Sequence, residues 1–332
     1  ADTLDKSEIK QHVVSGYVAG DMGALFSLPA GPVEFAVGAE YRKEKSKNVP
    51  SAEDQAGYTF GNIIAPTVGD FDVKEVFLEV DVPLLADKPG AQLLSVDGAV
   101  RFSDYSTIGN ATTWKVGTVW QPIEDVTFRG TVAEATRAPN IGELFDPGGQ
   151  TFEFIDDPCD VSRLQNGTSF RAANCAQILA GLGVDPDTYT DPNSFSIGGV
   201  SKGNPDLTEE TVDTVTFGVI LRPRFIENLT ISIDWYDIEL KNAVNAEPPQ
   251  AAAELCVDLP TTNNDFCGRF EREVGTGGIV DFVQQSLNVA AFNTEGFDFT
   301  VDYVVDPSEW GASGNWGVFN FRVVGNKLEE LE

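Results

Sequence analysis

This 332-residue chain is poor in histidine, the residue type most often used in acid–base catalysis and as a metal ligand. It has a single histidine, His12, so a histidine-based metal site is excluded. The stretch "DPDTYTDPN" offers Asp185, Asp187 and Asp191 as oxygen ligands for a divalent cation. It lacks the glycine and the closing glutamate of an EF-hand loop, so a plain Asp-Pro turn is the favoured interpretation. No Ser/His/Asp set is present. We therefore predict no catalysis, no metal and no cofactor.

Four cysteines form two local pairs in polar connections. Cys159 and Cys175 lie in one Gly/Pro-rich stretch, and Cys256 and Cys267 lie in another. Three pairings are formally open. We favour the disulfides Cys159–Cys175 and Cys256–Cys267, because each closes a short loop within one connection. This indicates an oxidising compartment. Free thiols in a cytosolic protein are the alternative.

The charge of the chain excludes one class of partner. Lys plus Arg number 22 against 52 Asp plus Glu, which gives a net charge of −30. Nucleic-acid binding needs a basic surface, so no nucleic acid is expected. No stretch approaches the 18 apolar residues of a transmembrane helix, and no signal peptide is visible at Ala1.

Most of the chain alternates apolar and polar residues with a period of two, which predicts β-strands. In "VEFAVGAEYR" (33–42), Val33, Phe35 and Val37 alternate with Glu34 and Ala36. The same pattern occurs in "VFLEVDVPL", "LSVDGAVRF", "WKVGTVW", "VTFRGTV", "VTFGVIL", "LTISIDWYD", "FDFTVDYVV" and "VFNFRVV". About ten strands result, most near the 9–11 residues that cross a bilayer at a tilt.

A β-sandwich also alternates, but three features favour a membrane barrel. The polar face carries charges of both signs at mid-strand, with Gly and Ala between them, as a wet lumen does. Aromatic residues gather at strand ends, as interfacial girdles do: Tyr41, Trp114, Trp120, Trp235 and Tyr303. Short connections also alternate with longer ones. The short connections are 29–32, 85–92, 121–125, 222–228 and 306–315, and the long ones are 43–73, 136–211 and 240–294.

These observations predict an all-β fold, an antiparallel transmembrane β-barrel segment with short periplasmic turns and long extracellular loops. Two sequence motifs can then be interpreted. "TRAPNIGELF" (136–145), followed by "GNPDLTEE" (203–210), resembles the barrel of TonB-dependent outer-membrane receptors. "IDWYDIEL" (233–240) and "NTEGFDFTVDY" (293–303) extend the resemblance over essentially the whole chain. The motif residues are Arg137, Ala138, Pro139, Asn140, Glu143, Leu144, Phe145, Asn204, Pro205, Asp206, Leu207 and Glu210.

The resemblance implies an active transporter in the outer membrane of a Gram-negative bacterium. Such a receptor binds a scarce solute (an iron-siderophore, cobalamin or an oligosaccharide) and imports it to the periplasm with TonB-coupled energy. Its partners would be the solute, the TonB complex, outer-membrane lipid and lipopolysaccharide. The family's plug and TonB-contacting segment are absent from residues 1–332, so we expect a partial barrel without plug or terminal strands. A passive porin-like channel and a secreted all-β binding or adhesion module are the alternatives.

Candidate solute contacts come from the largest connection. We select Arg137, Asn140, Phe152, Phe154, Phe170, Tyr189 and Phe195, because aromatic and polar side chains on outer loops suit the capture of a bulky solute. In the alternative, the loop packs its own aromatics, and the two motifs only shape the rim. Pro139 must end a strand ladder, since it has no backbone donor. The stretches 173–183 and 248–259 are predicted to be short helices.

Overall fold

The computed structural model describes residues 4–307 and 317–331, and a single β-sheet dominates them. Ten long strands form its main part, as the alternation predicts. They are β1 (Lys6–Asp21), β2 (Glu34–Val49), β3 (Thr67–Lys88), β4 (Ala91–Tyr105), β5 (Gly109–Ile123), β6 (Val126–Arg137), β9 (Glu210–Leu221), β10 (Leu229–Ala246), β12 (Ile279–Val305) and β13 (Phe319–Leu331).

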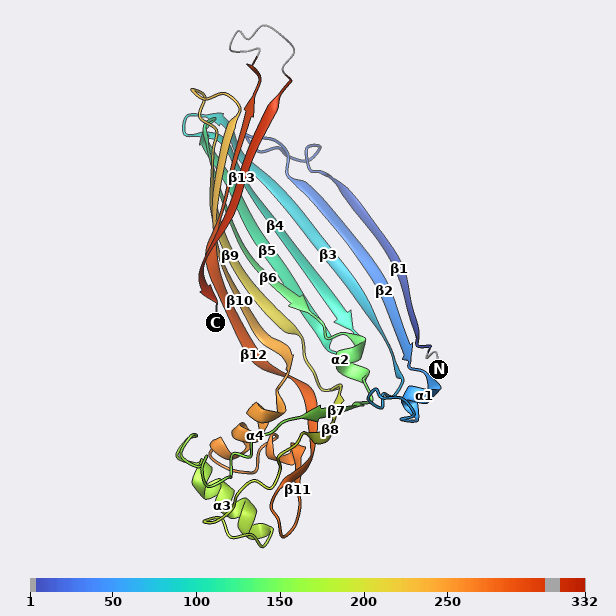
Figure 1. The fold of residues 1–332 in the computed structure, drawn as a ribbon. Helices are drawn as coiled ribbons and strands as arrows, with labels where there is room; N and C mark the ends of the chain where they lie inside the picture. Colours follow the sequence, from blue (N-terminus) through green and yellow to red (C-terminus); the bar gives the residue numbers. More distant parts are fainter. Residues whose placement is uncertain (1–3, 308–316, 332) are drawn as a thin grey trace.

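Each long strand pairs antiparallel with the next one in that order. The strands therefore run up and down around one curved wall, which is barrel architecture. Figure 1 shows the tilted strands, with the β12–β13 hairpin standing in front of β4–β6. Within the described residues the sheet does not close, and β1 and β13 are the edges of the wall. The predicted all-β barrel segment of about ten strands is confirmed.

One face of the wall is apolar. Val37, Leu78, Val100 and Trp114 are directly paired across β2, β3, β4 and β5, so they project from the same face. These side chains remain accessible: 47% of Val37 and 42% of Leu78 are exposed. A continuous apolar surface of this extent is typical of a sheet that faces lipid.

The opposite face is polar and lies on the concave side of the wall. Glu75 and Ser103 on this face are each 7% exposed, whereas their chain neighbours Val76 and Phe102 are each 53% exposed. Side chains on the concave side of a curved sheet converge and cover one another, and those on the convex side diverge. The polar face is therefore the inner surface of the barrel wall.

Glycines on the inner face make room for ion pairs between strands that are not neighbours. Arg129 on β6 donates from Nε and Nη2 to Asp234 on β10, both at 2.7 Å. The bridge passes over Gly218 of β9, where a Cβ would lie 1.8 Å from the Asp234 Oδ1 atom. Bidentate pairs of this kind fix geometry as well as charge. The small residues of the polar face thus have a packing role.

The long connections gather at one end of the wall, beyond the lower ends of the strands in Figure 1. They contain α1 (Ala52–Gln55), α2 (Ile141–Phe145), β7 (Gly149–Glu153), α3 (Arg171–Gly181), β8 (Ile197–Lys202), α4 (Pro249–Asp258), η1 (Cys267–Arg269) and β11 (Phe270–Arg272). The predicted helices at 173–183 and 248–259 correspond to α3 and α4. None of the described helices combines the length and the apolar character needed to span a bilayer.

The strands are longer than the 9–11 residues predicted for most of them. β3 has 22 residues, β10 has 18 and β12 has 27. About ten residues suffice to cross the hydrocarbon layer, so these strands continue past it toward the long connections. In β10 this outer part, "ELKNAVNA", is largely polar, so the apolar pattern used for prediction ends before the ladder does. Most of the expected short connection 306–315 lies outside the described residues.

Candidate solute-binding site in the outer loops

The rim motif is a closed network of polar contacts. Arg137, the last residue of β6, faces Glu210, the first residue of β9. Its guanidinium donates from Nε to Glu210 and from Nη1 and Nη2 to Glu143, the latter at 3.0 and 3.2 Å. Glu210 also accepts from the backbone N–H of Val244 at 2.6 Å. All three guanidinium nitrogens are therefore engaged within the rim.

Asn140 begins the short helix α2 with a capping box. Its side chain accepts from the backbone N–H of Glu143 at 2.9 Å, and the Glu143 carboxylate accepts from the Asn140 N–H at 2.7 Å. The Asn204 N–H donates to the Glu143 carbonyl at 2.7 Å. The strings "RAPN" and "GNPD" thus meet in space, although some sixty residues separate them. These contacts favour a rim-shaping role for both motifs.

Helix α2 is folded inward over the wall. A Cβ on Gly69 of β3 would lie 2.5 Å from the Phe145 ring and 2.8 Å from an Ile141 methyl group. Leu144 is only 2% exposed. The glycine therefore lets the helix approach the backbone of β3, and the motif residues Leu144 and Phe145 are packing residues.

Two long connections fold together into one compact body, which we call the outer loop unit (residues 149–202 and 249–285). β7 pairs antiparallel with β8, and β8 pairs parallel with the outer part of β12. Two small cores fill it. It contains the disulfides Cys159–Cys175 and Cys256–Cys267, which are the pairs favoured by spacing. Figure 1 shows this unit beyond the ends of β10 and β12.

Buried charges join the two halves of the outer loop unit. Asp157, 1% exposed, accepts from the Arg272 guanidinium at 2.5 and 2.9 Å and from the Tyr189 hydroxyl at 2.6 Å. Arg171 and Asp258 form a second bidentate pair at 2.8 and 2.5 Å. Burial, and then the neighbouring Asp157 carboxylate, raise the pKa of Tyr189, which keeps its phenol a neutral donor.

The selected aromatic residues fall into two groups. Tyr189 is 4% exposed and belongs to the core of the unit, so its ring is not available to a solute. Phe152, Phe154, Phe170 and Phe195 are 49%, 76%, 42% and 66% exposed. Large apolar side chains held at such exposure on a rigid body are typical of a binding surface. Phe170 lies apart from the other three, at the start of α3.

Sequence reasoning missed part of this surface. Tyr58 and Phe60, in the connection between β2 and β3, are 84% exposed and fully exposed, respectively. Ile63 and Ile64 follow them and are also exposed. The stretch "GYTFGNII" has the same signal that selected the other aromatics, namely apolar rings in a long polar connection.

A pocket of about 610 Å³ lies between this connection and the outer loop unit. Backbone hydrogen bonding closes one side, where the Gln150 N–H donates to the Ile63 carbonyl at 2.7 Å. Its lining residues are Gln55, Ile63, Ile64, Ala65, Pro66, Gly148, Gly149, Gln150, Gly198, Gly199, Val200, Val280 and Asp281. An apolar hollow with a few amides, one carboxylate and much exposed backbone is typical of a ligand site.

Glycines give the pocket its flat floor. The Phe152 ring lies 3.4 Å from where a Cβ on Gly198 would stand, so it covers this glycine. On Gly199 a Cβ would lie 2.5 Å from the Phe282 carbonyl oxygen. A side chain there would displace β12 from β8, so the open floor and the sheet pairing depend on the same residues.

The three aspartates of "DPDTYTDPN" serve local structure. Asp185 accepts from the Asp187 N–H at 3.1 Å, and Asp191 accepts from the N–H groups of Asn193 at 2.9 Å and Asp157 at 3.1 Å. The bonds from Asp187 and Asn193 are the contacts of Asx turns, and the bond from Asp157 ties this turn to residues 34 positions earlier. No group of three or more potential metal ligands is present among the described residues.

The wall and its clustered loops define the chain as part of an outer-membrane-type β-barrel. It belongs to the family described as TonB dependent receptor-like, beta-barrel, whose sequence pattern it matches over residues 5–329. A comparison with curated protein sequences gives no match.

Solved structures show the same fold at low sequence identity. The siderophore receptor PirA from Pseudomonas aeruginosa is 15% identical, with a TM-score of 0.53 over 97% of this chain and 44% of its own. PirA from Acinetobacter baumannii gives 15% and 0.54, over 90% of this chain and 35% of its own. The ferric enterobactin receptor PfeA gives 15% and 0.56, over 89% and 34%. The chain thus spans less than half the length of these receptors.

Proposed function

We propose that this chain is the wall and outer loop region of an outer-membrane receptor in a Gram-negative bacterium. The receptor binds a scarce, bulky solute at the outer loops and imports it to the periplasm with energy supplied through TonB. The family membership supports the class of activity, because it is a family of receptors and transporters.

One observation carries the solute-binding proposal. The pocket of about 610 Å³ opens at the loop end of the wall, and exposed aromatic rings come from the connections that form it. Such rings gain affinity by covering apolar or ring-shaped solutes at little entropic cost, since each has only two rotatable bonds. Iron-siderophores, cobalamin and oligosaccharides are the solute classes proposed, and the similar PirA and PfeA receptors favour testing siderophores first.

The pocket has both the size and the chemistry for this role. Its volume falls in the range of sites that enclose most of a small ligand. Gln55, Gln150 and Asp281 provide polar groups that can orient a solute, and the glycine backbone lets it approach closely. The outer loop unit holds Phe152 against Gly198 of the pocket floor before any solute arrives, which lowers the entropic cost of binding.

The test uses the full-length receptor in cells, with uptake of labelled siderophores, cobalamin and oligosaccharides. For the transported solute we expect the double variant Phe152→Ala/Phe154→Ala to weaken binding about tenfold or more. Phe170→Ala is the matched control, since Phe170 is exposed but lies at the start of α3, which contributes no lining residue, whereas Phe152 lies on β7, which does. Uptake must also stop in cells without TonB. Uptake that persists without TonB would show a passive channel in place of an active transporter. Equal losses of binding in the double variant and in Phe170→Ala would show that the pocket is not the solute site.

A further inference from the structure

The lining of the pocket of about 610 Å³ contains a single charged side chain, Asp281 on β12. Asp281 is exposed, and it forms no ion pair with any of the described residues. Its Oδ1 atom accepts from the backbone N–H of Phe282 at 2.7 Å, which orients the carboxylate. The described residues provide no donor for its Oδ2 atom. The pocket therefore presents one negative charge with an acceptor to spare.

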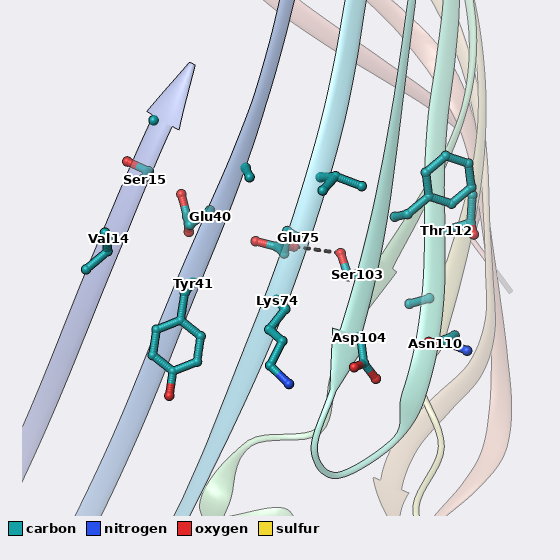
Figure 2. A pocket seen from close by; sticks show the side chains of 15 residues that line it. Val14, Ser15, Glu40, Tyr41, Lys74, Glu75, Ser103, Asp104, Asn110 and Thr112 are labelled. Carbon is teal, nitrogen blue, oxygen red and sulfur yellow. Dashed lines mark hydrogen bonds between the residues drawn. The ribbon is translucent and has the colours of Figure 1, made fainter. Parts of the chain in front are cut away.

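A carboxylate of the wall shows how the chain neutralises such a charge elsewhere. Glu75 lines the groove of about 880 Å³ on β1–β5. It accepts from the Ser103 hydroxyl at 2.6 Å, the bond drawn in Figure 2, and from the Arg101 guanidinium at 3.4 Å. Asp281 has neither a hydroxyl nor a guanidinium beside it among the described residues. A group from outside the described chain has to take their place.

A second carboxylate stands directly opposite Asp281. Glu271 on β11 is paired with Asp281, and the neighbouring pair is Phe270 with Phe282. Phe270 and Phe282 pack in the core of the outer loop unit, so Glu271 and Asp281 project from the other face of these strands. Both acids are exposed. Like charges directly opposite each other destabilise a sheet, and a cation bound beside them removes this cost.

Basic residues are scarce around the pocket. The segments 50–66, 146–154, 197–202 and 279–285 contain five acids and one base, Lys202. Lys202 is paired with Gln285, which lies four residues along β12 from Asp281, or roughly 13 Å. This lysine is therefore too far along the strand to neutralise Asp281. The five acids are Glu53, Asp54, Asp146, Glu153 and Asp281.

The opposite side of the pocket adds an acceptor and a further negative charge. Gln55, which lines the pocket, donates from its side-chain amide to the Pro50 carbonyl at 2.7 Å, which leaves its amide oxygen as an acceptor. Asp54 precedes it and accepts from the hydroxyls of Ser51 at 2.6 Å and Thr59 at 2.5 Å. These hydrogen bonds lower the pKa of Asp54, so its carboxylate stays ionised.

We infer that Asp281 determines which solutes the pocket accepts, because it binds a positively charged group of the solute, such as an ammonium group, and repels anionic solutes. The inference rests on the proposed function, since it takes this pocket as the solute site. The cationic group contacts Asp281, with Glu271 opposite, and the apolar body of the solute covers Ile63 and Ile64. Among ferric complexes, those that carry a free amine fit this pocket, and polyanionic tris-catecholates do not.

The charge of the pocket can be measured before the solute is known. All four cysteines of the chain are in disulfides, so one introduced thiol serves as a reporter. The variant Val200→Cys places it in the pocket lining. The purified full-length receptor, in detergent at low ionic strength, is reacted with methanethiosulfonates that carry either a trimethylammonium or a sulfonate group. The control site is Phe225→Cys, since Phe225 is 86% exposed in the short connection 222–228.

The expected result is a preference for the cationic reagent. One carboxylate in a partly wet pocket changes a rate by about fivefold per unit charge, so the two reagents should differ by about twentyfold at Val200→Cys relative to Phe225→Cys. Asp281→Asn should remove most of this preference, and Asp281→Glu should retain it. Asp187→Asn is the matched control, because it removes one exposed carboxylate elsewhere in the outer loop unit and should change nothing. Heat-modifiable gel migration checks that each variant is folded.

Equal rates for the two reagents at Val200→Cys, or a preference that Asp281→Asn leaves unchanged, would overturn the inference. The transported solute gives an independent test. Acetylation of its amine should weaken binding about fivefold in the unaltered receptor and hardly at all in Asp281→Asn. A transported solute without a positive group would overturn the inference and leave the proposed function intact. Absence of TonB-dependent uptake, with the charge preference present, would count against the proposed function alone.

Discussion

The wall and the outer loop unit are stabilised in different ways. The wall is held by long antiparallel ladders, and its apolar side chains point outward and remain half-exposed in the isolated chain. The outer loop unit has short strands and small cores, with buried ion pairs and two disulfides. The wall therefore relies on lipid to cover its apolar face, whereas the loop unit resembles a small secreted domain that carries its own cross-links.

This contrast has a functional consequence. Long loops on a barrel are commonly mobile, because they lack buried apolar contacts. Here two of the long connections share a core and the Asp157–Arg272 pair, and each has its own disulfide, so they pack as one body. The proposed solute pocket lies between that body and the connection of residues 50–66. We expect the two regions to respond separately to mutation.

The largest effect is expected inside the loop unit. Asp157→Ala leaves the guanidinium of Arg272 buried without its carboxylate and takes the acceptor from the Tyr189 hydroxyl. Removing one partner of a buried pair costs about 3–5 kcal/mol. Hydrogen exchange of α3 and α4 in the detergent-solubilised receptor should accelerate strongly, while β1–β6 stay protected. Asp156→Ala is the control, because the Asp156 side chain makes only an exposed pair with Arg163, and its backbone bonds to Gln250 remain in the variant. Equal protection of α3 and α4 from hydrogen exchange in both variants would show that Asp157 does not stabilise the outer loop unit.

A smaller effect, confined to the wall, is expected from Gly218→Ala. The added Cβ would meet the Asp234 carboxylate and displace the Arg129–Asp234 bridge. Overpacking of this kind costs about 1–3 kcal/mol. The temperature at which heat-modifiable migration is lost should fall, and exchange in the loop unit should not change. In the matched variant Gly130→Ala the new Cβ has only ordinary contacts at 3.6 Å or more. A similar fall in this temperature for Gly130→Ala would show that the effect of Gly218→Ala does not come from displacing the Arg129–Asp234 bridge.

The wall was predictable because a lipid-facing strand has to alternate. Period-two patterns located nine of the ten long strands and assigned Val37 and Leu78 to the apolar face and Glu79 to the polar one. The pattern did not predict the parts of the strands that extend past the apolar face toward the long connections. "YRKEKSKNV" also alternates, but between lysines and other polar residues, so the strand was expected to end at 42 and not at Val49. Lys45 and Lys47 were therefore assigned to the predicted long connection 43–73.

The loop unit was only partly predictable. The spacing of Cys159, Cys175, Cys256 and Cys267 indicated its disulfides, and "ANCAQILAGLG" indicated a helix. The pair of Asp157 and Arg272 joins residues 115 positions apart. No local pattern encodes such a contact, since it depends on how two connections fold together. Tyr189 was selected as an exposed aromatic for the same reason, because burial of a ring in a polar loop is decided by tertiary packing.

The smallest predicted effect concerns the rim motif, which lies between the wall and the outer loop unit. Asn140→Ala removes the acceptor for the Glu143 N–H and breaks the capping box of α2. Loss of such a cap costs about 1 kcal/mol, so exchange at 141–145 should accelerate about fivefold. Asn140→Ser keeps a capping oxygen and should remain close to the original. If the rim only shapes the barrel, solute affinity will follow this local stability. A large loss of affinity in Asn140→Ser, with α2 still protected, would instead show that the Asn140 amide itself contacts the solute.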